Sequence, residues 1–324
     1  MRQVVLAYLC AALLLLCSAC GYEQEDVSFA TGEVTLSGTL YLPSGKGPHP
    51  AVVFIHGSGP DSREQYRFYG DLFAKRSIAA LIYDKRGVGR SAGDWTRSPF
   101  SALVDDVQSA VAFLREHPAI DRARIGAWGG SEGAIVAAWA ASRTRDISFV
   151  VMQSATGVPF AEQNLHQTLV QMRALNLPPG EVNEALAFQR LKHAYARSGS
   201  GWAGYISALN ASRNEPWATL GGPNQPDDWW WQWYRTKMDV DPRPILESLR
   251  VPVFAVWGGR DHLVPVERSR AIVQQALAGR ADGRTRLMVV PEADHSLNTP
   301  EGPNPAPEYI DAMFSWLSER NGTP

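Results

Sequence analysis

The segment spanning residues 125–141 constrains the fold more than any other stretch of the chain. An apolar run ends in Gly129-Gly130-Ser131-Glu132-Gly133, and an alanine-rich run with high helix propensity follows at once. A Gly-x-Ser-x-Gly pattern between a strand and a helix is typical of a tight turn that presents a serine above a sheet. Small residues at Gly129 and Gly133 let strand and helix pack closely. Ser131 would then lie at a helix N-terminus, where unpaired N–H groups point outward.

Strand and helix patterns alternate on both sides of this turn. Continuous apolar runs, typical of strands buried on both faces, occupy residues 51–55, 78–83, 125–128 and 149–152. Helical patterns lie between them, and residues 27–42 form an entry hairpin with a turn at Thr31-Gly32. This order predicts an α/β fold with a mostly parallel central sheet and helices on both faces.

The alternation stops at Gly157 and returns near Val251. The intervening residues lack strand patterns and contain helix-like runs at 163–175 and 182–196. We therefore expect four regions: a leader at 1–20, a first core part at 21–156, a helical, tryptophan-rich lid insertion at 157–248, and a second core part at 249–324.

A candidate acid and a candidate base follow the serine along the chain. Asp261 comes after the strand pattern at 251–257, and His295 after the last strand pattern at 286–290. Ser, Asp and His in this chain order are typical of a hydrolase triad. Ser131 would be the nucleophile, His295 would accept and return its proton, and Asp261 would orient the imidazole.

Other residues compete for these roles. His56 precedes the serine and His262 precedes the last strand, so both are weaker candidates for the base. Asp294 is better explained as a loop anchor, and two acids before the returning strand, Asp239 and Asp241, are a weak alternative to Asp261.

A glycine-rich loop, His56-Gly57-Ser58-Gly59-Pro60, follows the strand at 51–55. Backbone N–H groups in such a loop can bind a developing oxyanion, so we assign this role to Ser58 N–H together with Glu132 N–H. A second loop, residues 84–91, contains Gly-x-Gly without the Lys-Ser/Thr of a phosphate-binding loop, and we expect a structural turn in which Asp84 pairs with Arg86.

The insertion contains an aromatic cluster, Asp227-Asp228-Trp229-Trp230-Trp231-Gln232-Trp233-Tyr234. Such a cluster can form a core, or it can line a substrate site, and both can hold together. Trp229, Trp230 and Trp233 are thus candidates for a substrate wall.

The N-terminal residues have the pattern of a secretory leader. A short basic start, an apolar run and Cys17-Ser18-Ala19-Cys20-Gly21 predict a signal peptide rather than a membrane span. Its end resembles a bacterial lipobox, which would make Cys20 the lipidated first residue of an exported, membrane-anchored protein. Cleavage after Ala19 by an ordinary signal peptidase, giving a secreted or periplasmic protein, is the alternative. All three cysteines lie in this segment.

The formal net charge of −2 gives no basic field for nucleic acid. The sequence contains no His-x-x-x-His, and no cysteine lies outside the leader, so we expect no metal site and no cofactor. We expect the protein to contact the membrane only through the lipid anchor.

Five blocks in this order resemble the α/β-hydrolase-fold serine esterases of exported bacterial kind, near the acyl-aminoacyl and dipeptidyl peptidases. The blocks are 56–60, 83–91, 129–133, 258–261 and 294–296. Gly130 stands where the family often has histidine. The resemblance implies a hydrolase acting through an acyl-enzyme on a small carboxylic ester. A peptidase or amidase with the same triad, and a catalytically silent ligand-binding lipoprotein, are the alternatives.

Overall fold

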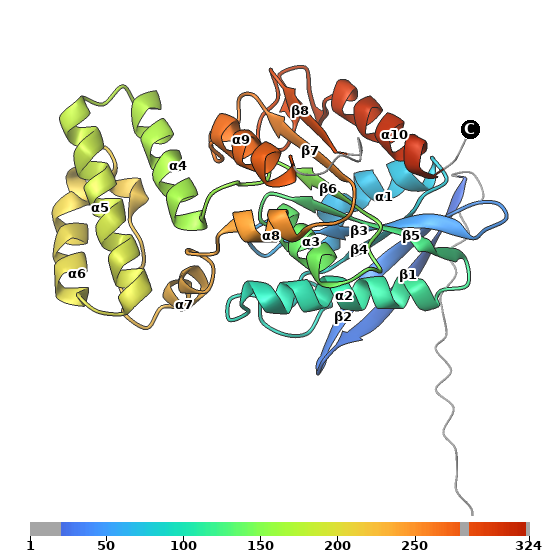
Figure 1. Cartoon of the computed structure of the whole chain (residues 1–324). Coiled ribbons are helices and arrows are strands. Elements are labelled where there is room, and N and C mark those ends of the chain that lie inside the picture. The colour runs from blue at the N-terminus through green and yellow to red at the C-terminus, as the bar shows by residue number, and fades with distance from the viewer. Residues whose placement is uncertain (1–20, 279–284, 322–324) are drawn as a thin grey trace, which may run out of the picture.

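A computed structural model describes residues 21–278 and 285–321 (Figure 1). The strands are β1 (Tyr22–Thr31), β2 (Val34–Pro43), β3 (His49–Ile55), β4 (Ala79–Tyr83), β5 (Ile120–Gly130), β6 (Phe149–Gln153), β7 (Val253–Gly258), β8 (Arg286–Val290), β9 (Asn298–Thr299) and β10 (Gly302–Pro305). The helices are α1 (Arg67–Ala74), α2 (Phe100–Glu116), α3 (Glu132–Arg143), α4 (Phe160–Ala174), α5 (Pro179–Ser198), α6 (Trp202–Ala211), α7 (Trp229–Arg235), α8 (Pro242–Ser248), α9 (Val266–Leu277) and α10 (Pro307–Asn321).

The central sheet has eight strands in the order β1-β2-β4-β3-β5-β6-β7-β8. The β1–β2 and β2–β4 pairs are antiparallel, and all later pairs are parallel. This confirms the predicted mostly parallel α/β sheet. Strand order reverses between β3 and β5, and a ligand site is expected beyond the carboxyl ends of strands at such a switch point. The serine loop follows β5 and the glycine-rich loop follows β3.

Two apolar cores cover the two faces of the sheet. Alternate residues of one strand point to opposite sides, so Val53 and Ile55 of β3 face α2 and α3, whereas Val52 and Phe54 face α1 and α10. Phe54 is fully buried and packs on Trp128 and Phe73. Burying a side chain of this size contributes about 1.5–3 kcal/mol to stability.

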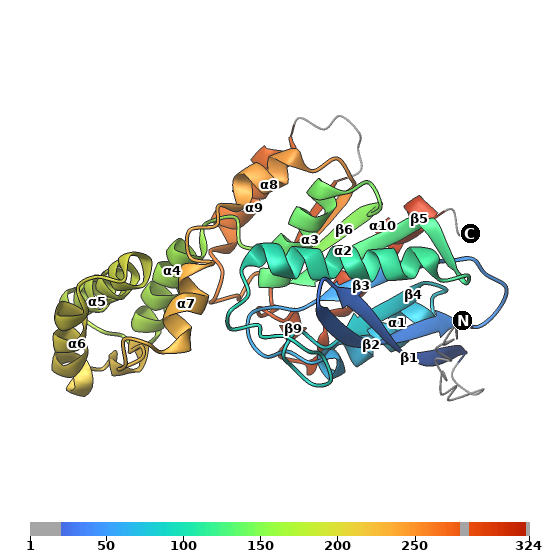
Figure 2. The same cartoon turned by 90° about the horizontal axis from the view of Figure 1, so that it is seen from below.

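The helical insertion runs between β6 and β7 and contains α4 to α8. Helices α4 to α7 stand to one side of the sheet as a separate lobe (Figures 1 and 2). Their own apolar cluster includes Phe188, Tyr205, Trp231 and Tyr234. Helix α8 is different because Leu246 joins the core beneath α3. The predicted segment 157–248 thus contains a lobe and one helix that packs on the core.

Several predicted elements are longer than expected, and three helices were not predicted. The entry hairpin extends over the whole of β1 and β2. Helices α6, α7 and α8 lie in segments where glycine, proline and tryptophan obscured helical periodicity. Among the described residues, none of the helices has both the length and the apolar character that a membrane span requires.

The turn after β4 pairs differently from the prediction. Arg86 binds both carboxylate oxygens of Asp106 on α2, at 2.8 Å from Nε and 2.6 Å from Nη2. Asp84 instead binds Arg63, whose Nη2 lies 3.2 Å from Oδ2. The expected Asp84–Arg86 pair is wrong because partners far away in sequence are brought to each side chain by the fold.

Candidate active site

Ser131 lies in a strained turn between β5 and α3. Its backbone φ and ψ are 54° and −118°, a combination that non-glycine residues rarely adopt. A Cβ placed at Gly129 would lie 2.1 Å from the carbonyl oxygen of Gly133, and one at Gly133 would lie 2.4 Å from that of Ile55. Only glycine fits at either position, as the motif predicts.

Backbone hydrogen bonds hold the turn. Ser131 N–H donates to the carbonyl of Gln153 at 2.8 Å, and Ala134 N–H donates to the carbonyl of Ser131 at 3.0 Å. The first bond joins the turn to β6, and the second begins helix α3. The strained serine is therefore fixed by the sheet on one side and by the helix on the other.

Asp261 and His295 come together on two loops at the same edge of the sheet. His295 Nδ1 lies 2.7 Å from Asp261 Oδ2. The other carboxylate oxygen, Oδ1, accepts N–H donors from Leu263 at 2.7 Å and Val264 at 3.1 Å. The Asp261 side chain is buried and held on both oxygens, so it can fix the orientation of the imidazole.

Close packing of these two loops explains the glycines before Asp261. A Cβ at Gly258 would lie 2.1 Å from the carbonyl oxygen of Asp294. Asp294 Oδ1 accepts the backbone N–H groups of Ser296 and Asn298, so its side chain organises the loop itself. Ser154 Oγ donates to the carbonyl of His295 at 2.7 Å. The base is thus held from its side chain and from its backbone.

The glycine-rich loop after β3 reaches the serine. A Cβ at Gly57 would lie 3.6 Å from the Cβ of Ser131, so the two turns are neighbours. Ser58 is exposed and lines the same pocket as Ser131. Glu132 is the first residue of α3, and the first N–H groups of a helix have no partner within it.

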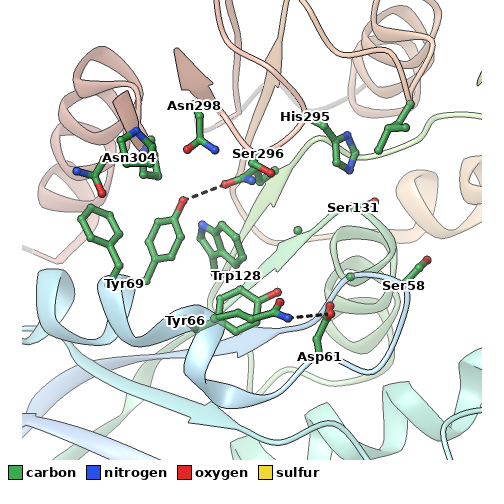
Figure 3. Close-up of a pocket in the computed structure, with 18 residues that line it drawn as sticks. Ser58, Asp61, Tyr66, Tyr69, Trp128, Ser131, His295, Ser296, Asn298 and Asn304 are labelled. Atoms are coloured by element: carbon green, nitrogen blue, oxygen red, sulfur yellow. Dashed lines mark hydrogen bonds between the residues drawn. The ribbon is translucent and has the colours of Figure 1, made fainter. Parts of the chain in front are cut away.

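A pocket of about 480 Å³ contains Ser131 and His295. Figure 3 shows both side chains at one end of it, with Tyr69 and Asn304 at the other. The remaining walls combine aromatic rings with carboxylate, amide and hydroxyl groups from Ser58, Asp61, Gln65, Tyr66, Phe68, Trp128, Gln153, Ser296 and Asn298. Such a mixed lining suits a small ligand with polar groups.

Asp61 is the one carboxylate that lines this pocket. Its Oδ1 accepts a hydrogen bond from Gln65 Nε2 at 3.2 Å, and Oδ2 would lie 3.7 Å from a Cβ at Gly57 (Figure 3). Burial raises the pKa of Asp61, and the Lys85 ammonium opposes that rise. A substrate cation or hydroxyl group is the natural partner for this carboxylate.

The three tryptophans of the proposed substrate wall do not line this pocket. Trp230 stacks on Tyr234, and Trp233 lies against Trp230 and Phe160, so both belong to the aromatic cluster of the helical insertion. Trp229 is 46% exposed and packs edge-on against another ring. The interpretation as a core describes Trp230 and Trp233, because the lobe needs large rings to fill its interior, whereas Trp229 lies at the surface.

The rival bases lie elsewhere. His56 is buried with its ring edge-on to Tyr83, and burial, aided by the Lys85 charge, lowers the pKa of His56 to about 3. This histidine is neutral and structural. His262 is exposed and does not line the pocket.

The rival acids are also accounted for. Asp239 pairs with Arg197 on the insertion, with Oδ1 2.5 Å from Nη2. Asp241 caps α8 by accepting the N–H of Arg243. Neither carboxylate is aimed at His295, whereas Asp261 is.

A buried charge cluster that the sequence did not predict lies beneath the serine turn. Glu132 Oε2 lies 2.8 Å from Lys237 Nζ and accepts a hydrogen bond from Ser58 Oγ at 2.9 Å. Glu132 Oε1 lies 3.3 Å from Lys85 Nζ. Lys85 follows a buried strand at the carboxyl edge of the sheet, a position that could have indicated a role near the site. Lys237 gives no such signal, because it lies in an ordinary charged segment of the insertion.

Across residues 21–278 and 285–321, no group of three or more His, Cys, Asp or Glu side chains is arranged to hold a metal ion. The polar groups around Ser131 are a hydroxyl, an imidazole, a carboxylate and backbone amides, which are the parts needed for nucleophilic acyl transfer.

Comparison with known proteins finds a family model and a relative that match most of the chain. The sequence model of the family described as "Serine aminopeptidase, S33" matches residues 46–299. Esterase EstD of Thermotoga maritima is 25% identical over 313 residues, which cover 91% of this chain and 68% of EstD.

Two solved structures share the fold. The esterase PF2001 of Pyrococcus furiosus has a TM-score of 0.63 at 19% identity, with 99% of this chain and 97% of that chain covered. The α/β hydrolase GrgF from Penicillium sp. sh18 has a TM-score of 0.63 at 18% identity, with 93% and 99% covered. The fold, the matched segment and the esterase relative lead to one assignment: the chain belongs to the serine aminopeptidase S33 family of α/β-hydrolases.

Proposed function

We propose that the protein hydrolyses small carboxylic esters through Ser131, His295 and Asp261. The observation that carries the proposal is the shared pocket. It holds a serine in a strained turn at a helix N-terminus together with a histidine whose Nδ1 is bound by a buried carboxylate. This combination supplies an activated nucleophile, a proton carrier and an orienting acid.

The roles follow from the hydrogen bonds. Asp261 accepts from Nδ1 of His295, which leaves Nε2 as the proton acceptor for Ser131 Oγ. Ser131 attacks the ester carbonyl, and His295 then passes the proton to the departing alcohol. A water molecule, activated by the same imidazole, attacks the acyl-enzyme and releases the acid. Backbone N–H groups of Ser58 and Glu132 would bind the oxyanion in both steps.

The size and lining of the pocket suggest which esters fit. A volume of about 480 Å³ suits a small substrate, and rings such as Trp128 and Tyr69 offer apolar contact beside the polar groups. We therefore expect short acyl groups to be preferred over long ones.

The test is covalent labelling with a fluorophosphonate probe followed by peptide mapping, together with turnover of p-nitrophenyl acetate, butyrate and decanoate. Labelling at Ser131, its loss in Ser131→Ala, and faster turnover of the short esters are expected. Folded wild-type protein that neither labels nor turns over these esters would favour a silent ligand-binding protein instead.

One observation favours a second candidate, an aminopeptidase. A free substrate amino group needs an anionic partner, and Asp61 places a carboxylate in the pocket near Ser131. An aminoacyl p-nitroanilide is the matching probe. Cleavage of it at rates above those of the esters, and loss of that cleavage in Asp61→Asn, would establish the peptidase instead.

We also propose export and lipid attachment at Cys20, which lies outside the described residues, as does the whole leader. The support is the sequence pattern alone. Fractionation of cells and metabolic palmitate labelling test it. Wild-type protein should be labelled and membrane-bound, whereas Cys20→Ala should be unlabelled. A Cys20→Ala protein that stays membrane-bound to the same extent as wild type would contradict the lipid anchor.

A further inference from the structure

Glu132 connects three parts of the molecule through its buried carboxylate. Lys85 comes from the turn after β4, Ser58 from the glycine-rich loop after β3, and Lys237 from the helical insertion. The side chains of Glu132 and Lys237 are fully buried, and that of Lys85 is 4% exposed. Because all three charged side chains are buried, each depends on the others for compensation of its charge.

The electrostatics favour an ionised carboxylate. Burial alone would raise the pKa of Glu132, but the ammonium groups of Lys85 and Lys237 outweigh it and lower the pKa. The cluster then has two positive charges and one negative charge, and it carries a net positive charge beside the turn that bears Ser131.

Both halves of the proposed oxyanion hole are attached to this cluster. Lys85 Nζ donates to the carbonyl of Gly57 at 2.7 Å, and Ser58 Oγ donates to Glu132. The loop that presents Ser58 N–H is therefore tied to the residue that presents the second N–H. A shift of the Glu132 side chain would change the distance between the two donors.

Lys237 connects the buried charge cluster to the helical insertion. It lies between α7 and α8, and its ammonium group also sits over the rings of Trp233 and Phe100, at 4.8 and 5.4 Å from their centroids. Trp233 belongs to the aromatic cluster of the lobe, whereas Phe100 begins α2 in the core. The next residue, Met238, accepts the N–H of Ala161 at the start of α4. Lys237 is thus placed at the junction of lobe and core.

We propose that Lys237 is a positioning residue through which the helical insertion sets the geometry of the oxyanion hole, an inference that rests on the proposed serine hydrolase function. Lys237 does not touch the substrate. It acts through Glu132. Packing of the insertion against the core is therefore coupled to the alignment of the two oxyanion donors. Movement of the lobe that withdraws Lys237 would lower the rate of acyl transfer more than substrate binding.

The inference implies a pH dependence. Burial lowers the pKa of Lys237 to about 8, opposed by the Glu132 carboxylate and aided by the Lys85 charge. These two are the charged groups that act on Lys237, and the neutral side chains near it include Phe100, Trp233 and Gln163. Above that pH the ammonium group loses its proton, Glu132 keeps only Lys85 as a partner, and kcat should fall.

The experiment compares Lys237→Met, Lys237→Arg and a matched control, Lys192→Met. Lys192 is a buried lysine of the same insertion, but its Nζ donates to the carbonyl of Leu220 and does not reach the core. For each variant, kcat and KM for p-nitrophenyl butyrate are measured from pH 6 to 10, with the fluorophosphonate labelling rate of Ser131 and a thermal melt.

Lys237→Met should lower kcat and the labelling rate about 10- to 100-fold, with KM changed less than about threefold, because the loss of a single oxyanion donor costs 10²–10³ and this change only misplaces donors. Lys192→Met should keep wild-type kcat. Lys237→Arg, whose charge persists at high pH, should keep its kcat beyond pH 9, whereas wild-type kcat declines there.

Other outcomes are distinguishable. Wild-type kcat and labelling in Lys237→Met, or equal losses in Lys192→Met, would overturn the inference and leave the proposed function standing. If Lys237→Met does not fold, the pH profile of Lys237→Arg decides the question. A decline of its kcat at alkaline pH identical to that of wild type would overturn the inference. Wild-type protein that does not label at Ser131 would overturn the proposed function and the inference together.

Discussion

Nδ1 of His295 lies 2.7 Å from Oδ2 of Asp261, although the two residues are 34 positions apart in the chain. The second oxygen of Asp261 is occupied by two backbone N–H groups of its own loop. The carboxylate can therefore reach His295 in one orientation only, and that orientation fixes the proton on Nδ1.

Asp261→Asn should reduce kcat about 10³- to 10⁴-fold, because an amide no longer favours the imidazole tautomer that can accept a proton from Ser131. The change is nearly isosteric, so the thermal melt should move little. Steady-state hydrolysis of p-nitrophenyl butyrate measures the effect. Asp239→Asn is the matched control. It removes an exposed acid that the sequence left open as an alternative, and it should keep wild-type kcat. Wild-type kcat in Asp261→Asn together with a large loss in Asp239→Asn would assign the acid to Asp239.

Gly133→Ala should prevent stable folding. The new Cβ would lie 2.4 Å from the carbonyl oxygen of Ile55 and 2.5 Å from that of His56, and both are backbone atoms that cannot move without shifting β3. We expect a loss of more than about 4 kcal/mol in the free energy of unfolding. Gly180→Ala in α5 is the control, since nothing lies within 4 Å of its Cβ position, and it should stabilise by about 0.5 kcal/mol. Urea denaturation compares the two. A folded Gly133→Ala protein of wild-type stability would contradict the described turn.

The order of motifs was readable from the sequence because each depends on local chemistry. Gly129 and Gly133 are required by close packing at one turn, and the apolar runs of β3 and β5 are required by burial on both faces. These constraints act within a few residues. They placed Ser131 after a parallel strand, as the structure has it.

Pairings between distant side chains could not be read in the same way. Asp84 and Arg86 are neighbours in sequence, yet each binds a partner on another element because the turn points them in different directions. Lys237 and Glu132 are 105 positions apart, and nothing in either local sequence specifies the other. The pocket residue Asp61 is similar, since its place beside Ser131 depends on how the loop after β3 folds back.

Glu132→Gln should destabilise the protein by about 3–5 kcal/mol, because the ammonium groups of Lys85 and Lys237 would lose their buried counter-ion. The free energy of unfolding in urea at pH 7 measures this. In the double variant Glu132→Gln with Lys237→Met, one uncompensated charge is removed, so the combined loss should be smaller than the sum of the two single losses. Additive losses would show that the two side chains do not interact.

Lys192→Met should remove a pH-dependent part of the stability. Burial lowers the pKa of Lys192 from 10.5 in the unfolded chain to about 8 in the native protein. Below pH 8 both states hold the proton, and the native state bears the full cost of a buried charge. Between pH 8 and 10.5 the native state releases the proton while the unfolded state keeps it, so native stability rises with pH.

The free energy of unfolding of wild type, minus that of Lys192→Met, should therefore increase by about 1–3 kcal/mol from pH 7 to pH 10. Taking the difference cancels the titration of all other groups. The carbonyl of Leu220 keeps a donor in the variant, because Gln189 Nε2 lies 3.3 Å from it, so the change leaves no unpaired acceptor. Urea denaturation at several pH values measures the difference. A difference that is constant with pH would show that Lys192 keeps its proton in the folded protein, with the charge stabilised by the ring of Trp230 at 5.5 Å.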